Sequence, residues 1–281
     1  MLRIGRIDYA NCTPIFHALQ DHAAPGDYQF ISGVPSHLNS MLASGELDAC
    51  PSSSFEYAVH PERYRIIPQV SISSCGAVAS VLLFSRIPVE ELDGHIVLLS
   101  SESATSVNLL KILLARRYGL CCTFEQTRLS IDDALMSAPA ILLIGDTALR
   151  ASLQRLDVHI YDLGEIWHSW TGLPFVFALW LCTRSAVQER RDELIRLSER
   201  LQVAKLESRR YIEALAEYAS EAEWLGKQRL IDYWRDNISY ELGPSHLEGL
   251  KHFFRGCAEL GLLATAPELH FLQDEQSAAS F

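Results

Sequence analysis

The chain has 281 residues, of which 48% are hydrophobic and 21% charged, so it can bury the core of one large or two ordinary α/β domains. Its formal net charge of −11 argues against nucleic acid as a partner, because a phosphate backbone is bound by clustered Lys and Arg. The sequence contains no signal peptide and no apolar run of the roughly 18 residues that span a membrane, so we expect a cytoplasmic protein without a membrane partner.

The first part of the chain alternates strand-like and helix-like segments. "LRIGRIDY" predicts a strand, "TPIFHALQD" a helix with Pro14 in its first turn, and "YQFISGV" a second strand. "PSHLNSMLASGELD" predicts a helix that ends near Gly45, with Ser36 as its N-cap. "ACPSSSFEYAVH" begins extended and turns helical, and "QVSISSCGAVASVLLFS" predicts one or two β segments.

A second alternating series follows "RIPVEELDG". "HIVLLS" predicts a strand, "SATSVNLLKILLARRYG" a helix that ends at Gly119, and "CTFEQT" another strand. "IDDALMS" predicts a short helix, and the unbroken apolar run of "APAILLIGD" predicts a buried parallel strand. "HIYDLGEIW" and the long strand "LPFVFALWLCT" come next. From about Ser185 the pattern is mostly helical, with breaks near Gly226 and Gly243.

This alternation predicts an α/β fold with parallel sheets and right-handed crossovers, arranged as two lobes. We expect residues 1–86 and 183–281 to form the first lobe, with the helical C-terminal part packed back on it, and residues 87–182 to form the second. In such folds small ligands bind beyond the carboxyl ends of the strands, so the ligand site is predicted in a cleft between the lobes.

Five short polar segments stand at the predicted strand ends: "DYANCT", "CPSSSFEY", "SISSCGAVAS", "SSESATS" and "IGDTA". Each can simply cap a helix, because Ser, Thr and Asn are preferred N-caps, and for any single segment this is the better interpretation. Together they could build an anion site from neutral donors and the unpaired N–H groups of helix starts. The candidate ligand-binding residues in these segments are Asn11, Thr13, Ser53, Ser54, Gly76, Ser103, Thr105, Ser106 and Asp146.

Motifs for other chemistries are absent from the sequence. The seven cysteines have no regular spacing and there is no HExxH, so we predict free thiols and no metal site. Neither a GxGxxG nor a Walker loop occurs, so no nucleotide cofactor is expected. His17 lies about one turn into the first helix, where it could reach a cleft. The aromatic stretch "WHSWTGLPFVFALW" is either core or one wall of a pocket for a flat ring.

Six segments carry a further signal when they are taken in order along the chain. They cover most of residues 2–182 and read "RIGRIDYANCTPIFHAL", "GVPSHLNSMLASGELDACPSSSFEYA", "GAVASVLLFSRIPVEELDG", "LLSSESATSVNLLKILL", "LLIGDTAL" and "DLGEIWHSWTGLPFVFALW". The ordered set resembles chorismate dehydratase of the futalosine route to menaquinone. That family has a fold similar to a type II periplasmic binding protein, with two α/β lobes and a cleft between them.

The resemblance implies a cofactor-free lyase that aromatises chorismate to 3-[(1-carboxyvinyl)oxy]benzoate. Asn11 and Ser80 would then lie nearest the reacting carbons. The proton acceptor is left open among the substrate's own enolpyruvyl carboxylate, His17 and Asp146, and the oligomeric state is not predicted. Besides the hydroxyls of the polar segments, the substrate-binding residues implied by the resemblance are Tyr9, Gly145, Thr171 and Pro174.

Two alternatives share the predicted fold. One is the sister lyase that acts on cyclic dehypoxanthine futalosine, although "DYANCTPIF" fits the dehydratase better. The other is a small-anion binding protein without enzymatic activity, such as a sensor or solute receptor. A purely structural interaction module is disfavoured by the polar strand ends.

Overall fold

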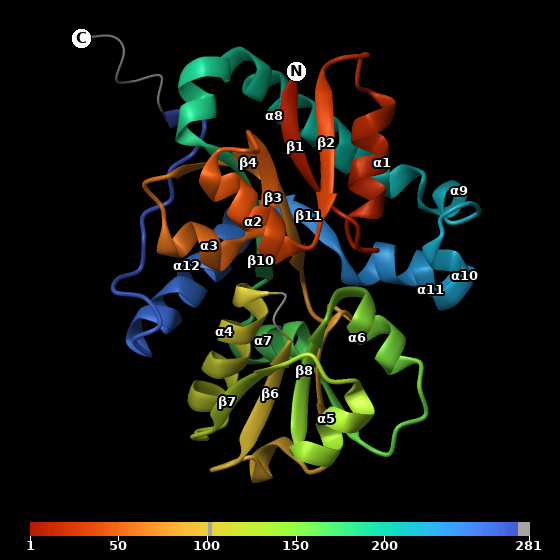
Figure 1. Ribbon diagram of the computed structural model, residues 1–281, viewed down its shortest axis with the longest axis vertical. Helices are drawn as coiled ribbons and strands as arrows, with labels where there is room; N and C mark the ends of the chain where they lie inside the picture. Colours follow the sequence, from red (N-terminus) through yellow and green to blue (C-terminus); the bar gives the residue numbers. More distant parts are fainter. Residues whose placement is uncertain (101–102, 275–281) are drawn as a thin grey trace.

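The computed structural model, which describes residues 1–100 and 103–274, has two lobes, each built on one sheet (Figure 1). In the first sheet the strand order is β11 (Ser239–Leu242), β4 (Tyr64–Ser74), β10 (Phe175–Thr183), β3 (Ala49–Ser53), β1 (Leu2–Ile7) and β2 (Tyr28–Gly33). In the second it is β7 (Thr123–Thr127), β6 (Ile96–Ser100), β8 (Ala140–Ile144), β5 (Val81–Ser85) and β9 (His159–Asp162).

Helices cover both sheets, and those after β10 pack on the first lobe, as the sequence predicts. Those of the first lobe are α1 (Thr13–Asp21), α2 (Pro35–Ser44), α3 (Ser54–Val59), α8 (Arg184–Arg210), α9 (Ile212–Leu215), α10 (Glu221–Leu225), α11 (Lys227–Asp232), the π-helix η3 (Tyr233–Asn237) and α12 (Pro244–Glu259). Those of the second are η1 (Val89–Glu91), α4 (Ala104–Ile112), the π-helix η2 (Leu113–Arg117), α5 (Ile131–Ser137), α6 (Gly145–Ser152) and α7 (Leu163–Thr171).

The two sheets are mixed, whereas the sequence predicted parallel ones. β1 runs parallel to β2 and β3, but β10 is antiparallel to β3 and β4. Likewise β6 is parallel to β7 and β8, but β5 is antiparallel to β8 and β9. The cause is that β5 and β10 each enter their sheet from the other lobe. They start at the edge where the lobe's own parallel strands end, so they must run the opposite way.

The same pairing corrects where the chain passes between the lobes. β5 was expected in the first lobe and β10 in the second, yet each pairs in the other sheet. The passages are therefore residues 75–80 and 172–174, immediately before these strands. Two local predictions were also wrong. The N-cap of α2 is Val34 rather than Ser36, because Pro35 takes the first helical position. Residues 239–242, predicted within a helical region, form the edge strand β11.

The buried hydrophobic residues form a large cluster that spans both lobes and a smaller one within the second lobe, and large aromatic side chains pack together in the large cluster. Phe16 of α1 lies with its ring centroid 5.4 Å from that of Trp180 in β10, and both side chains are buried. Throughout residues 1–100 and 103–274, each helix is too short or too polar to cross a bilayer.

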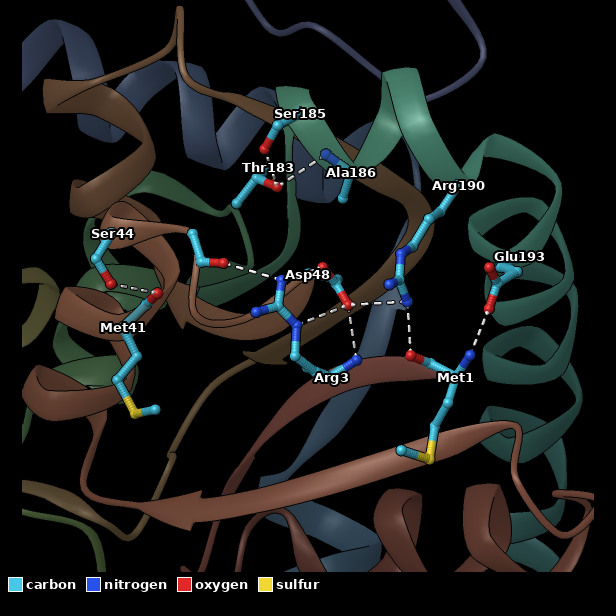
Figure 2. Close-up of polar contacts among 11 residues, drawn as sticks. Met1, Arg3, Met41, Ser44, Asp48, Thr183, Ser185, Ala186, Arg190 and Glu193 are labelled. Carbon is cyan, nitrogen blue, oxygen red and sulfur yellow. Dashed lines mark hydrogen bonds and ion pairs between the residues drawn. The ribbon is translucent and has the colours of Figure 1, made fainter.

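An ion-pair network around Asp48 joins the start of β1 to β3 and α8 (Figure 2). The Asp48 carboxylate accepts hydrogen bonds from the backbone N–H of Arg3 at 2.8 Å and from its guanidinium at 2.7 Å. The guanidinium of Arg190 lies 3.7 Å from the same carboxylate and donates to the Met1 carbonyl at 2.6 Å. Burial raises the pKa of Asp48, but the hydrogen bonds and charge of Arg3 outweigh it and hold the pKa below its ordinary value of 3.8.

Replacing Asp48 by Asn should lower the free energy of unfolding by about 2 kcal/mol at neutral pH, because both guanidinium groups lose a charged acceptor. Because the folded-state pKa is depressed, this contribution is complete above pH 3.8 and is lost as the pH falls through the folded-state value. Urea unfolding at several pH values measures the difference between parent and Asp48→Asn. A difference in free energy of unfolding that stays constant as the pH is lowered would contradict a stabilising role for the Asp48 charge. Glu125→Gln, at an exposed site on β7, serves as the control.

Candidate active site

A cavity lies between the strand ends of the two lobes, with about 610 Å³ of space that includes open solvent. Among the described residues that line it, none carries a charge. Its polar groups come from Tyr9, Asn11, Ser53, Ser80, Ser103 and Ser106. Its remaining lining residues are Ile7, Pro35, Ile72, Val78, Val81, Ile144, Gly145, Phe177, Ala178 and Ile238. Such a mixture of apolar walls and few polar groups is typical of a small-molecule site.

Asn11 lies in the loop between β1 and α1, and the peptide groups around it are held from both sides. The N–H of Ala10 donates to Asp146 Oδ1 of the second lobe at 2.9 Å. The carbonyl of Ala10 accepts from Trp234 Nε1 at 2.7 Å, and that of Asn11 accepts from the Tyr240 hydroxyl at 2.7 Å. The Asn11 side chain is thereby presented to the cavity on a fixed backbone.

The Asn11 side-chain oxygen is buried and has no hydrogen-bond partner among the described residues. A buried amide oxygen without a partner costs about 1–3 kcal/mol, and native proteins seldom keep one without a reason. This oxygen lies in the cavity wall, where a molecule in the cavity could supply the missing donor.

Tyr9 and Gly145 bring the lobes into direct contact at the same place. A Cβ atom built on Gly145 would lie 2.9 Å from two atoms of the Tyr9 ring, so the ring rests on the bare backbone at the start of α6. Gly145 also has a φ of +57°, a conformation that other residues seldom adopt. Its N–H donates to the carbonyl of Ser80 at 2.8 Å, which ties α6 to the passage between the lobes.

Ser53, which lines the cavity, bonds across the lobes to Thr105. The two hydroxyl oxygens lie 2.6 Å apart, although Ser53 ends β3 in the first lobe and Thr105 starts α4 in the second. Thr105 Oγ1 also accepts the N–H of Phe55 at 3.1 Å. Thr105 of the second lobe therefore accepts a hydrogen bond from a backbone N–H at the start of α3 in the first lobe. Next to Thr105, the Ser103 hydroxyl caps α4 by accepting the N–H of Ser106, as the sequence predicts for a cap.

Ser80 stands at the end of the first passage, directly before β5. The preceding turn includes Ala79 with a φ of 58°, a left-handed conformation that is uncommon outside glycine. The carboxylate of Asp162 holds this turn by accepting the N–H groups of Val78 and Ala79, the latter at 2.6 Å. Burial raises the pKa of Asp162, and these N–H donors offset the rise only in part. The turn fixes the direction of the buried Ser80 side chain.

Of the predicted site residues, the structure brings Tyr9, Asn11, Ser53, Ser80, Ser103, Ser106 and Gly145 together in the cavity wall. Thr105 and Asp146 lie just behind the wall and join the lobes. The others are farther from the lining. The Thr13 hydroxyl donates to Glu221, the Ser54 hydroxyl to the Val176 carbonyl and the Thr171 hydroxyl to the Trp167 carbonyl. Gly76 lies in the passage at 75–80, and Pro174 packs against Gly249.

His17 does not reach this cavity. Its ring lies 3.3 Å from Asp21 and lines a separate hollow with Tyr218. In the part of the chain that the structure describes, no group of three His, Cys, Asp or Glu side chains could hold a metal ion. Phe177 and Ala178 of the cavity wall belong to the aromatic stretch for which the sequence left core and pocket wall open. Sequence reasoning missed other wall residues, such as Ile72, and the residues behind Asn11 and Ser80 that come from the C-terminal part. Nothing in their local pattern separates them from ordinary core.

The family described as menaquinone biosynthesis matches residues 2–259. The chain belongs to this family. It is 32% identical over 266 residues to a chorismate dehydratase of Thermus thermophilus, covering 89% of this chain and 93% of the relative. It is 28% identical over 263 residues to a chorismate dehydratase of Campylobacter jejuni, covering 92% and 98%.

Solved structures of the same fold include a binding protein of the periplasm. A protein from Archaeoglobus fulgidus superposes with a TM-score of 0.70 at 18% identity, covering 93% of this chain and 98% of its own. The periplasmic aliphatic sulphonate-binding protein of Escherichia coli superposes with a TM-score of 0.67 at 14% identity, covering 94% and 89%. The fold of this family member is thus that of a two-lobed periplasmic binding protein, as the sequence predicts.

Replacing Thr105 by Val should loosen the contact between the lobes, because Ser53 and the N–H of Phe55 both lose their partner while side-chain shape is kept. Small-angle X-ray scattering should show a larger radius of gyration than for the parent protein. Thr171→Val is the matched control, since among the described residues that hydroxyl bonds to Trp167 and Leu173 within its own segment. Identical scattering of parent and Thr105→Val would show that this bond does not hold the lobes together.

Proposed function

We propose that the protein is a chorismate dehydratase, a carbon–oxygen lyase that acts in menaquinone biosynthesis. The observation that carries the proposal is the cavity in which Asn11 and Ser80 meet the hydroxyls of Ser53 and Ser103 from opposite lobes. It is supported by similarity along most of the chain to two chorismate dehydratases. The substrate is a small dianion whose ring would fit between the apolar walls.

Neutral groups bind the two carboxylates in this proposal. The hydroxyls of Ser103 and Ser106 stand at the start of α4. Gly145 begins α6, where its own N–H is already bonded to the Ser80 carbonyl and only the following N–H groups are left for a ligand. Helix starts carry partial positive charge and N–H groups without intrahelical partners, so they attract anions. In a cavity shielded from water such dipoles act more strongly than they would in bulk solvent. The positive potential is thereby supplied without a charged side chain among the described lining residues.

The reaction removes the ring hydroxyl and the proton of the neighbouring ring carbon, so that one C–O and one C–H bond break, the ring becomes aromatic and water leaves. Asn11 and Ser80 would contact the reacting carbons and the departing hydroxyl. Asn11 is neutral and cannot be the base. Of the acceptors considered, His17 faces a separate hollow and Asp146 receives the N–H of Ala10. This favours the substrate's own enolpyruvyl carboxylate as the proton acceptor.

Holding one conformer is the main task of such an enzyme, because aromatisation itself is downhill. Positioning can lower a barrier by about 7–11 kcal/mol in favourable cases. The lobes would also exclude water and suppress rearrangement of the enolpyruvyl ether. A cytoplasmic location and activity without a cofactor remain predictions from the sequence.

The proposal predicts that purified protein converts chorismate to 3-[(1-carboxyvinyl)oxy]benzoate, seen as loss of one water by mass spectrometry. Chorismate recovered unchanged from a tight complex would instead favour the small-anion receptor. Turnover of cyclic dehypoxanthine futalosine in place of chorismate would identify the sister lyase.

Asn11→Ala should lower kcat by about 100-fold, the usual loss when one preorganised polar contact to a transition state is removed. Asn39→Ala is the matched control, because Asn39 Oδ1 is also buried without a partner among the described residues but lies on α2 outside the cavity lining. Full turnover by Asn11→Ala, with the fold confirmed by thermal unfolding, would remove Asn11 from the mechanism.

A further inference from the structure

The C-terminal segment 233–240 reaches the back of the candidate active site. It comprises η3 and the beginning of β11, and it follows the helices α10 and α11, which lie beside α6 (Figure 1). Four of its side chains donate hydrogen bonds to the loop around Asn11 or to the passage that carries Ser80. These donors are Tyr233 to Ser80 Oγ at 2.9 Å, Trp234 to the Ala10 carbonyl at 2.7 Å, Asn237 to the Ala77 carbonyl at 3.0 Å and Tyr240 to the Asn11 carbonyl at 2.7 Å.

Tyr233 differs from the other three because it contacts a side chain rather than a backbone carbonyl. Its own side chain is buried, with an exposed fraction of 3%. The backbone of Ser80 is already held by Gly145, whose N–H donates to the Ser80 carbonyl at 2.8 Å. The hydrogen bond from Tyr233 is therefore not needed to position the Ser80 backbone. It acts on the orientation of the Ser80 hydroxyl.

The direction of this hydrogen bond determines what the Ser80 hydroxyl can do. Burial raises the pKa of Tyr233 far above its ordinary value, so the phenol keeps its proton and donates it. Ser80 Oγ accepts the hydrogen bond from Tyr233, and the Ser80 hydroxyl donates its own to the Val78 carbonyl over a long 3.3 Å. A hydroxyl that accepts a hydrogen bond also becomes a better donor. The Ser80 proton is thus available to a substrate oxygen that binds more closely.

The local helix geometry accounts for the position of Tyr233. Residues 233–237 form a π-helix, in which one extra residue per turn re-aims the side chains, and such turns are frequent at functional sites. Here Tyr233 and Trp234, adjacent in sequence, are both buried and bond to Ser80 and Ala10.

We propose that Tyr233 is a positioning residue that orients the Ser80 hydroxyl as a hydrogen-bond donor to the departing ring hydroxyl of the substrate. The inference rests on the proposed function, and it adds a residue that does not line the cavity. No bond to Tyr233 forms or breaks in the reaction.

A double-mutant cycle tests this role with Tyr233→Phe, Ser80→Ala and the double variant, each assayed with chorismate. Tyr233→Phe should lower kcat by about tenfold and leave KM within about twofold, because the oriented donor acts in the transition state. In the Ser80→Ala background the same change should alter kcat by less than about twofold, since the group through which Tyr233 acts is gone.

Tyr57→Phe is the matched control for loss of a buried tyrosine hydroxyl. The Tyr57 hydroxyl donates to the Glu268 carbonyl and accepts the N–H of His270, and Tyr57 does not line the cavity, so removal of this hydroxyl should leave kcat unchanged. Tyr233→Phe with the parent kcat, while Ser80→Ala is impaired, would overturn this inference alone. An equal loss in both backgrounds would mean a merely structural role and would also overturn it. A parent protein inactive on chorismate would overturn the proposed function and this inference together. A fully active Ser80→Ala would overturn this inference and the role given to Ser80, while the dehydratase activity would stand.

Discussion

The site depends on polar groups at the strand ends of one lobe being satisfied by side chains of the other. The N–H of Ala10 bonds to Asp146, and Ser53 and Phe55 share Thr105. These bonds form only when the lobes meet, because each pairs groups from separate sheets. The same contacts border the cavity, so the cavity takes its shape only when the two lobes are closed on each other. Of the groups in these contacts, Asp146 brings a carboxylate, which the N–H of Ala10 pairs, and Ser53 and Thr105 bring neutral hydroxyls. In a chain with a net charge of −11, the proposed binding of an anion therefore depends on hydroxyls and helix starts.

Two features keep the lobes in register around that cavity. The passages at 75–80 and 172–174 feed antiparallel strands directly into the sheets, and Asp162 fixes the turn before Ser80. On the outer side, the guanidinium of Arg150 on α6 lies 3.9 Å from the ring centroid of Trp224 on α10, a cation–π contact between lobes. A fold used by binding proteins for capture can in this way hold a reactive ring in one conformer, which is the requirement of a dehydration that is already downhill.

Local sequence patterns were sufficient for most strands and helices up to β10 and for the polar strand ends that supply Asn11, Ser53 and Ser103. They assigned no element to "HIYDLGEIW", where the structure has β9 and the start of α7. They could not give the direction of β5 and β10, because strand pairing is a long-range property. They missed β11, which is only four residues long. They also missed Tyr233, whose bond to Ser80 spans 153 residues of sequence. The apolar walls, such as Ile72, look like ordinary core because a pocket wall and a core strand obey the same burial pattern.

A crystal structure of the protein with 3-[(1-carboxyvinyl)oxy]benzoate bound tests the account most directly. We expect the ring between Asn11 and Ser80, its carboxylates on hydroxyl and N–H donors from both lobes, and a new partner on the Asn11 side-chain oxygen or a turned amide. A ligand held by one lobe alone, or by surface lysines and arginines outside this cavity, would contradict the account.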